Sequence, residues 1–140
     1  MGYFYAVTAA VIWWLAYALD QRILEHISTP ILVFINALFT VLVLLPFILT
    51  HGDEVKSLAT IDKMTLTFLG ASLLATLLAG FLILIAIGAI GAPKAAIFEI
   101  AYPFFVVIFS IFLYQSHVNN YFIFGSIFLF IGSFIIITKG

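Results

Sequence analysis

The stretch AIFEIAYPFF at residues 96–105 places an ionisable side chain inside an otherwise apolar run. Glu99 is followed at helical spacing by Tyr102 and Pro103, so a helix would carry all three on one face. If the run crosses a membrane, its carboxyl group should face a bundle interior or a water cavity, where it could exchange protons or recognise a cation. An ion pair or interhelical hydrogen bond is the alternative, although Lys94 lies roughly 140° around the helix from Glu99. Pro103 leaves the Glu99 carbonyl without its usual helical partner, or it makes an ordinary kink.

A second group of candidate residues is aromatic or carries an amide. Trp13, Trp14 and Tyr17 cluster midway along an apolar run, and Trp13 and Tyr17 share a helix face at i,i+4 spacing. A cation could stack on these rings, whereas simple packing explains the cluster equally well, and both interpretations stay open. Asn36 is a polar residue within another apolar run. An interhelical hydrogen bond is the expected role of its amide, with ligand binding as the alternative.

The other polar residues do not form a reactive or metal-binding set. The chain has no cysteine, which excludes disulfides and cysteine metal sites. His26, His51 and His117 lie far apart near the ends of apolar runs, so we expect interfacial side chains rather than a metal centre. There is no nucleophile–base set and no phosphate loop, so neither an enzyme nor a cofactor is expected. The net charge of -1 gives no basic surface for nucleic acid.

Composition places these residues in a membrane. Of 140 residues, 66% are hydrophobic and 8% are charged, with a mean hydropathy of +1.33, whereas soluble domains are about 25% charged. A helix needs about 20 apolar residues to span the hydrocarbon, and the sequence offers five such runs, at residues 3–19, 30–50, 64–89, 92–114 and 120–138. Apolar residues fill both parities of each run, which contradicts a membrane barrel. We therefore predict an all-α integral membrane protein with five transmembrane helices and no cleaved signal peptide.

The charges of the connections bear on orientation. Five spans put the termini on opposite sides, with Lys56 and Lys63 on the N-terminal side and Arg22, Lys94 and Lys139 on the other. Two basic residues against three is too small a bias to fix one orientation. Either the C-terminal side prefers the cytoplasm slightly, or copies insert both ways with dual topology.

Three stretches carry a family resemblance: AAVIWWLAYALDQRIL at 9–24, GAPKAAIFEIAYPFFVVIFSIFLY at 91–114 and FGSIFLFIGSFIIITKG at 124–140. They resemble the first, fourth and fifth helices of an EamA-type domain of the drug/metabolite transporter superfamily. The shared features are a Trp midway along the first helix, a Pro within the fourth, and two glycines seven residues apart in the fifth. Asn36 stands near a place where that family often carries an Arg.

Small residues in the last run indicate a helix contact. Gly125 and Gly132 are seven residues apart, with Ser126 and Ser133 beside them. Such spacing lets backbones approach closely, because packing drives helix association in lipid. The pattern is similar to the dimer-forming heptad of small multidrug transporters in the same superfamily, so we expect a protomer–protomer seam there.

The resemblance implies that this chain is equivalent to one half of a ten-helix inverted-repeat transporter. It implies transport of small metabolites or drug-like solutes by alternating access around a midplane pocket. The implied partners are the lipid bilayer, a small-molecule substrate, and either a second copy in a homodimer (possibly antiparallel) or a paralogue in a heterodimer. We expect a plasma membrane of the prokaryotic inner-membrane type. The alternatives are a flippase subunit for a lipid-linked substrate and a non-transporting structural membrane protein.

Overall fold

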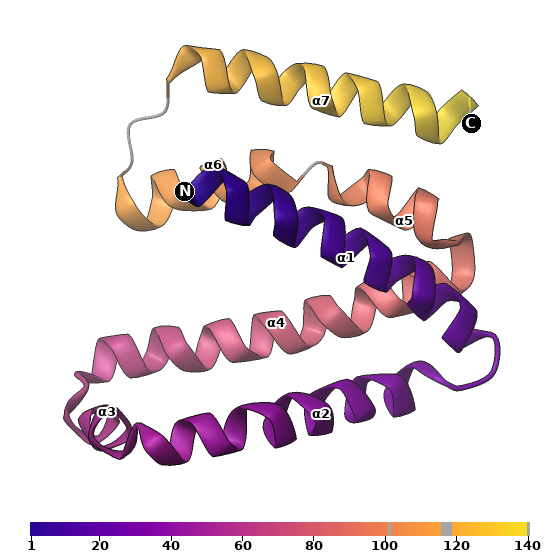
Figure 1. The fold of residues 1–140 in the computed structure, drawn as a ribbon. Coiled ribbons are helices and arrows are strands. Elements are labelled where there is room, and N and C mark those ends of the chain that lie inside the picture. The colour runs from indigo at the N-terminus through magenta and orange to yellow at the C-terminus, as the bar shows by residue number, and fades with distance from the viewer. Residues whose placement is uncertain (101, 116–118, 140) are drawn as a thin grey trace. The chain divides into compact units, whose positions relative to one another are not determined.

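The computed structural model describes residues 1–100, 102–115 and 119–139, and within those ranges it is built of helices without strands (Figure 1). Five helical segments are long and apolar enough to cross a membrane: α1 (Gly2–Leu24), α2 (Thr29–Thr50), α4 (Lys63–Ile90), α5 with α6 (Ala92–Tyr114) and α7 (Asn120–Lys139). The predicted all-α membrane fold with five spans is therefore confirmed.

Two segments are more helical than their polar sequences suggested. The predicted first span ends at residue 19, whereas α1 continues to Leu24, because Gln21 and Arg22 are good helix formers. The polar connection between α2 and α4 contains the helices α3 (Gly52–Ser57) and η1 (Leu58–Thr60). Acidic residues in the first turn of α3 and a lysine in its last turn suit the helix dipole and support this short helix.

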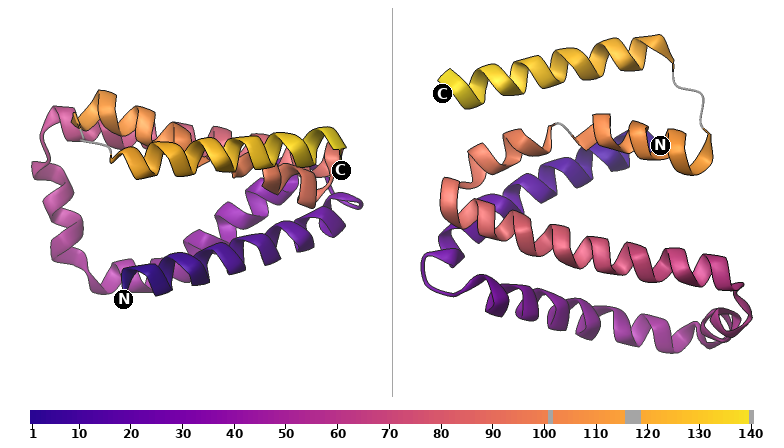
Figure 2. Two further views of the ribbon diagram at one scale, coloured as in Figure 1. Left: turned by 90° about the horizontal axis from the view of Figure 1, so that it is seen from above. Right: turned by 180° about the vertical axis from the view of Figure 1, so that it is seen from behind.

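The chain divides into two compact units. The first unit comprises Met1–Gln21 and Ala86–Gly140, and therefore contains most of α1 together with α5, α6 and α7. The second unit comprises Arg22–Ile85, which holds α2, α3, η1 and most of α4. Within the first unit, α7 runs back beside α5 and α6, as the views in Figure 2 show. All the cavities described below belong to the first unit.

The core of the first unit is small. Tyr17 of α1, Ile87 at the end of α4, and Ala92 and Ala95 of α5 are buried. Alanine side chains let helix backbones approach closely, which is how helices associate in lipid. Because most large apolar side chains remain exposed, the outer surface needs lipid or another helix to cover it.

A single glycine makes the turn from α4 into α5 (Ala92–Glu99). Gly91 has φ +84° and ψ 154°, a combination that side-chain-bearing residues rarely adopt. The Ala92 N–H donates a 2.6 Å hydrogen bond to Oε1 of Gln21 on α1, and Pro93 has no N–H to satisfy. The beginning of α5 is thereby held against α1.

We expect Gly91→Ala to destabilise the protein by about 1–3 kcal/mol, because alanine must adopt an unfavourable backbone conformation. A new Cβ would lie 3.5 Å from Gln21 Oε1, an ordinary contact, so the effect should come from the backbone. Denaturant unfolding in mixed micelles measures the change. Gly80→Ala in α4 is the control, because no heavy atom beyond its chain neighbours and its own helix backbone lies within 4 Å of the added Cβ, and it should leave stability unchanged or raised. Equal stability of the two variants would contradict the strained turn.

Candidate functional site

One hydrogen bond joins the two groups of residues that the sequence singled out. The Tyr17 hydroxyl of α1 donates to Oε1 of Glu99 across 2.9 Å, although the two residues are 82 positions apart. Tyr17 is 7% exposed, so its phenol is one of the few buried polar groups of the first unit. A hydrogen bond to a carboxylate is stronger than one between neutral groups. This bond therefore fixes the Glu99 side chain relative to α1.

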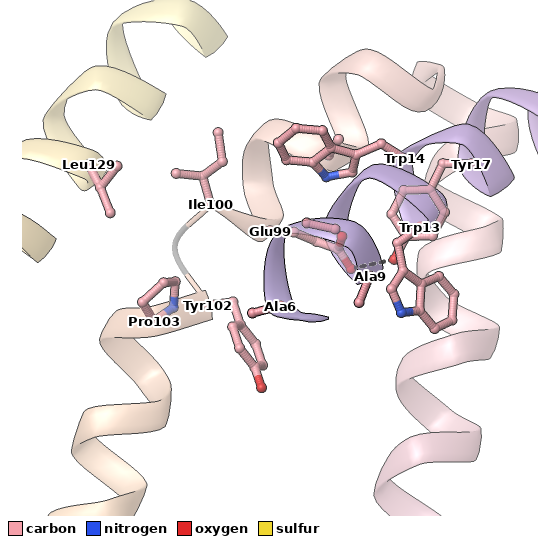
Figure 3. Close-up of a pocket in the computed structure, with 12 residues that line it drawn as sticks. Ala6, Ala9, Trp13, Trp14, Tyr17, Glu99, Ile100, Tyr102, Pro103 and Leu129 are labelled. Atoms are coloured by element: carbon pink, nitrogen blue, oxygen red, sulfur yellow. Dashed lines mark hydrogen bonds between the residues drawn. The ribbon is translucent and has the colours of Figure 1, made fainter. Parts of the chain in front are cut away.

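The carboxylate lies at a cavity of about 690 Å³ within the first unit (Figure 3). Helices α1, α5, α6 and α7 contribute its lining, which comprises Ala6, Ala9, Ala10, Trp13, Trp14, Tyr17, Ala96, Glu99, Ile100, Tyr102, Pro103 and Leu129. The residues of the first unit that the sequence predicted to line a substrate or proton pathway thus all border this one cavity. The volume is within the range of about 300–1,000 Å³ that small-molecule sites occupy.

The span that carries Glu99 is described in two helical parts. Helix α5 ends at Glu99, Ile100 follows with helical backbone angles (φ -60°, ψ -22°), and α6 (Tyr102–Tyr114) begins after residue 101, which lies outside the described ranges. Together the two parts form the candidate membrane span Ala92–Tyr114, and Pro103 is the second residue of α6. Glu99, Tyr102 and Pro103 all border the cavity, as one helix face at that spacing would place them.

The aromatic cluster of α1 forms part of the cavity wall. The rings of Trp13 and Tyr17 have centroids 5.8 Å apart with planes tilted by 54°. Trp13 and Trp14 are both more than half exposed in the structure, and both border the cavity. Figure 3 shows the two indoles and the Tyr17 ring grouped around the Glu99 side chain. Packing and pocket lining were open alternatives, and the geometry allows Tyr17 to do both.

Glu99 is the charged residue of the cavity lining. Lys94 lies instead beside a separate hollow of about 220 Å³, whose other lining residues include Ile136 and Ile137 of α7. The ion pairs of the described chain join Arg22 to Glu25 and Lys56 to Asp53, and both are exposed. Within the described residues, the Tyr17 hydroxyl is thus the polar partner of the carboxylate.

Sequence reasoning missed two features of the site. Gln21 lies beyond the predicted first span, whereas in the structure it belongs to α1. Its Oε1 accepts a hydrogen bond from the N–H of Ala92 at the start of α5. The small residues that leave room for the cavity were also overlooked, although Ala6, Ala9 and Ala10 follow the i, i+3, i+4 spacing of one helix face. That spacing was the available signal.

Other predicted residues lie elsewhere. Asn36 is exposed on α2 in the second unit, where its backbone carbonyl accepts a 2.8 Å bond from the Thr40 hydroxyl. His51 lies at the end of α2 and stacks on Phe47, with ring centroids 4.2 Å apart. His117 falls outside the described residues. Among the described residues, no group of three His, Cys, Asp or Glu side chains is placed to hold a metal ion.

The four small residues of α7 divide into two pairs. Ser126 and Ser133 are buried within the first unit, and the Ser133 hydroxyl donates to the Leu129 carbonyl at 2.8 Å. Gly125 and Gly132, in contrast, have no other part of the described chain within 4 Å of an added Cβ. The protomer seam remains a prediction, and within it the glycine pair is the part that has room for another helix.

We expect Tyr17→Phe to lower the free energy of unfolding by roughly 0.5–1.5 kcal/mol, because it removes one hydrogen bond and keeps the ring. Glu99→Leu should also destabilise the protein, and the double variant should cost less than the sum of the two. Unfolding of all four proteins in mixed micelles gives this cycle. Tyr121→Phe, at the exposed start of α7, is the control and should have no effect. Strict additivity in the cycle would contradict a direct Tyr17–Glu99 interaction.

Comparison with known proteins places this architecture in a family. The family model of the EamA-like transporter family matches residues 1–138, nearly the whole chain. No curated protein and no solved structure matches the sequence. Members of this family are membrane transporters of the drug/metabolite superfamily rather than enzymes. The chain, with its five membrane-spanning helical segments, therefore belongs to the EamA-like transporter family.

Proposed function

We propose that this protein moves a small metabolite or drug-like solute across the membrane and binds it in the cavity at Glu99. The observation that carries the proposal is the Tyr17–Glu99 hydrogen bond at the border of an aromatic-lined cavity. A carboxyl group within a transmembrane segment is unfavourable unless it has a function or a partner. Here it has one partner and an adjoining space large enough for a solute.

The position of Glu99 within a membrane-spanning segment supports transport. Ionisable residues at membrane depth usually face a bundle interior or a water cavity and mark the paths of substrates or ions. In this chain Glu99 lies within the segment Ala92–Tyr114, and residues of both α5 and α6 line the cavity. Rocking of the helices around this cavity would open it to one side of the membrane and then to the other.

The proposed assembly is a pair of five-helix protomers in opposite orientations. Because each protomer has five spans, an inverted protomer is the natural complement of the first. The basic residues, two on one side and three on the other, allow insertion both ways. The inverted protomer is then a second copy of this chain or a paralogue, with Gly125 and Gly132 of α7 in the seam. We place the assembly in a plasma membrane of the prokaryotic inner-membrane type.

Replacing the carboxylate should abolish coupled transport. We expect Glu99→Gln in liposomes with an imposed pH gradient to slow solute accumulation at least about tenfold, because the amide cannot bind or release a proton. Liposomes are given a defined mixture of metabolites and drug-like solutes, and their contents are identified by mass spectrometry. Glu54→Gln is the matched control, because Glu54 lies on the short helix α3 outside the spans. Accumulation that is equal in the two variants would contradict the proposed role of Glu99.

Tags at both termini test the inverted assembly. We expect each tag to be detected from both faces of the membrane in intact cells, because the charge bias is weak. The double variant Lys56→Ala with Lys63→Ala removes both basic residues from the N-terminal side. It should therefore shift the population to one orientation, with the C-terminus in the cytoplasm. A single orientation of the unaltered protein would exclude the inverted homodimer and leave a paralogue as the inverted protomer.

A further inference from the structure

We propose that the solute bound at Glu99 is an organic cation that carries apolar or aromatic substituents. This inference rests on the proposed function, because it takes the cavity at Glu99 as the transport site. Two properties of the cavity carry it: the sign of its charge and the aromatic character of its wall.

The charge of the site is negative and locally uncompensated. Of the described residues that line the cavity, Glu99 is charged, and none is Lys or Arg. Its Oε1 accepts from Tyr17, whereas Oε2 has no hydrogen bond within the described chain. A carboxylate in an apolar surrounding is stabilised by a counter-charge. A cation in the cavity would supply that charge while Tyr17 keeps the carboxylate in position.

Aromatic rings complete a site for a cation. Trp13, Trp14, Tyr17 and Tyr102 all border the cavity, and the first three are grouped around Glu99 (Figure 3). The face of an aromatic ring attracts a cation, most strongly for tryptophan, and the attraction grows when water is excluded. Tertiary or quaternary ammonium and phosphonium groups are recognised in this way because their charge is spread over apolar surface.

The same lining disfavours other classes of solute. A carboxylate or phosphate would meet the Glu99 charge without any basic residue to offset it. A sugar or another polyhydroxylated solute would lose many hydrogen bonds to water, and beside Glu99 the side chains of the described lining offer only tyrosine hydroxyls and indole N–H groups to replace them. An apolar cation loses little on entering such a wall and gains the carboxylate.

The chain provides its own reporter for the test. It contains two tryptophans, and both border the cavity, so intrinsic tryptophan fluorescence reports on occupancy of this site. Tetraphenylphosphonium and tetraphenylborate have nearly the same size and shape and opposite charge. We expect saturable fluorescence changes in detergent micelles with tetraphenylphosphonium and only non-saturable changes with tetraphenylborate. Glu99→Gln should weaken phosphonium binding at least about tenfold, and Glu54→Gln should leave it unchanged.

A second variant keeps the inference testable if Glu99→Gln does not fold. Trp13→Leu removes one exposed ring of the cavity wall and keeps Trp14 as the reporter. It should weaken phosphonium binding severalfold while the unfolding transition stays in place. Saturable binding of both ions with equal affinity, or phosphonium binding that neither variant alters, would overturn the inference.

The liposome assay separates this inference from the proposed function. If phosphonium does not bind but another solute accumulates in a Glu99-dependent manner, the substrate class is wrong and transport through this cavity stands. If phosphonium binds with the expected dependence and no solute accumulates, the cation site is supported and the transport proposal fails.

Discussion

The hydrogen bond between Tyr17 and Glu99 is the constraint on which the rest of the first unit depends. A buried polar group in an apolar medium is stable only when it has a partner, so a Tyr–Glu pair fixes how two helices can meet. Gln21, one turn further along α1, makes a second polar contact with the opposite end of α5 through Ala92. Two polar contacts, one at each end of the eight-residue helix α5, define its direction and register against α1. The small buried residues Ala92 and Ala95 then permit the close approach that these contacts require.

This double attachment gives the turn before α5 a physical meaning. Gly91 turns the chain through a conformation that suits glycine, and it thereby brings the start of α5 to Gln21 of α1. The end of α5 is held to the same helix by the bond between Tyr17 and Glu99. In the proposed transport cycle, α1 and α5 would therefore move as one body.

Much of this arrangement follows from the sequence, and the remainder depends on tertiary contacts. Hydropathy alone predicts five helical spans, since each apolar run must satisfy its backbone internally. Glu99 and the aromatic cluster were recognised because a carboxyl group or a pair of indoles is unusual midway along such a run. Their direct contact could not be predicted, because local spacing does not specify which residues 82 positions apart will meet. The same limit applies to Gln21, because local spacing does not show that its side chain will accept a hydrogen bond from the Ala92 N–H, 71 positions away.

A single carboxylate per protomer has consequences for an inverted pair. If the cavities of the two protomers join, the pair presents two Glu99 side chains to one apolar space, and like charges at close range disfavour simultaneous ionisation. A cation or a proton held between the carboxylates would relieve that repulsion, so the two would compete for the same position. Such competition couples an outward flux of cations to an inward flux of protons only when the empty cavity does not change its access, because an empty cavity that reopens on the other side lets each flux run alone. If the cavities instead stay separate, each Tyr17–Glu99 pair acts alone, and each protomer binds its own cation or proton. The number of cations bound per assembly, one or two, therefore follows from whether the two cavities join.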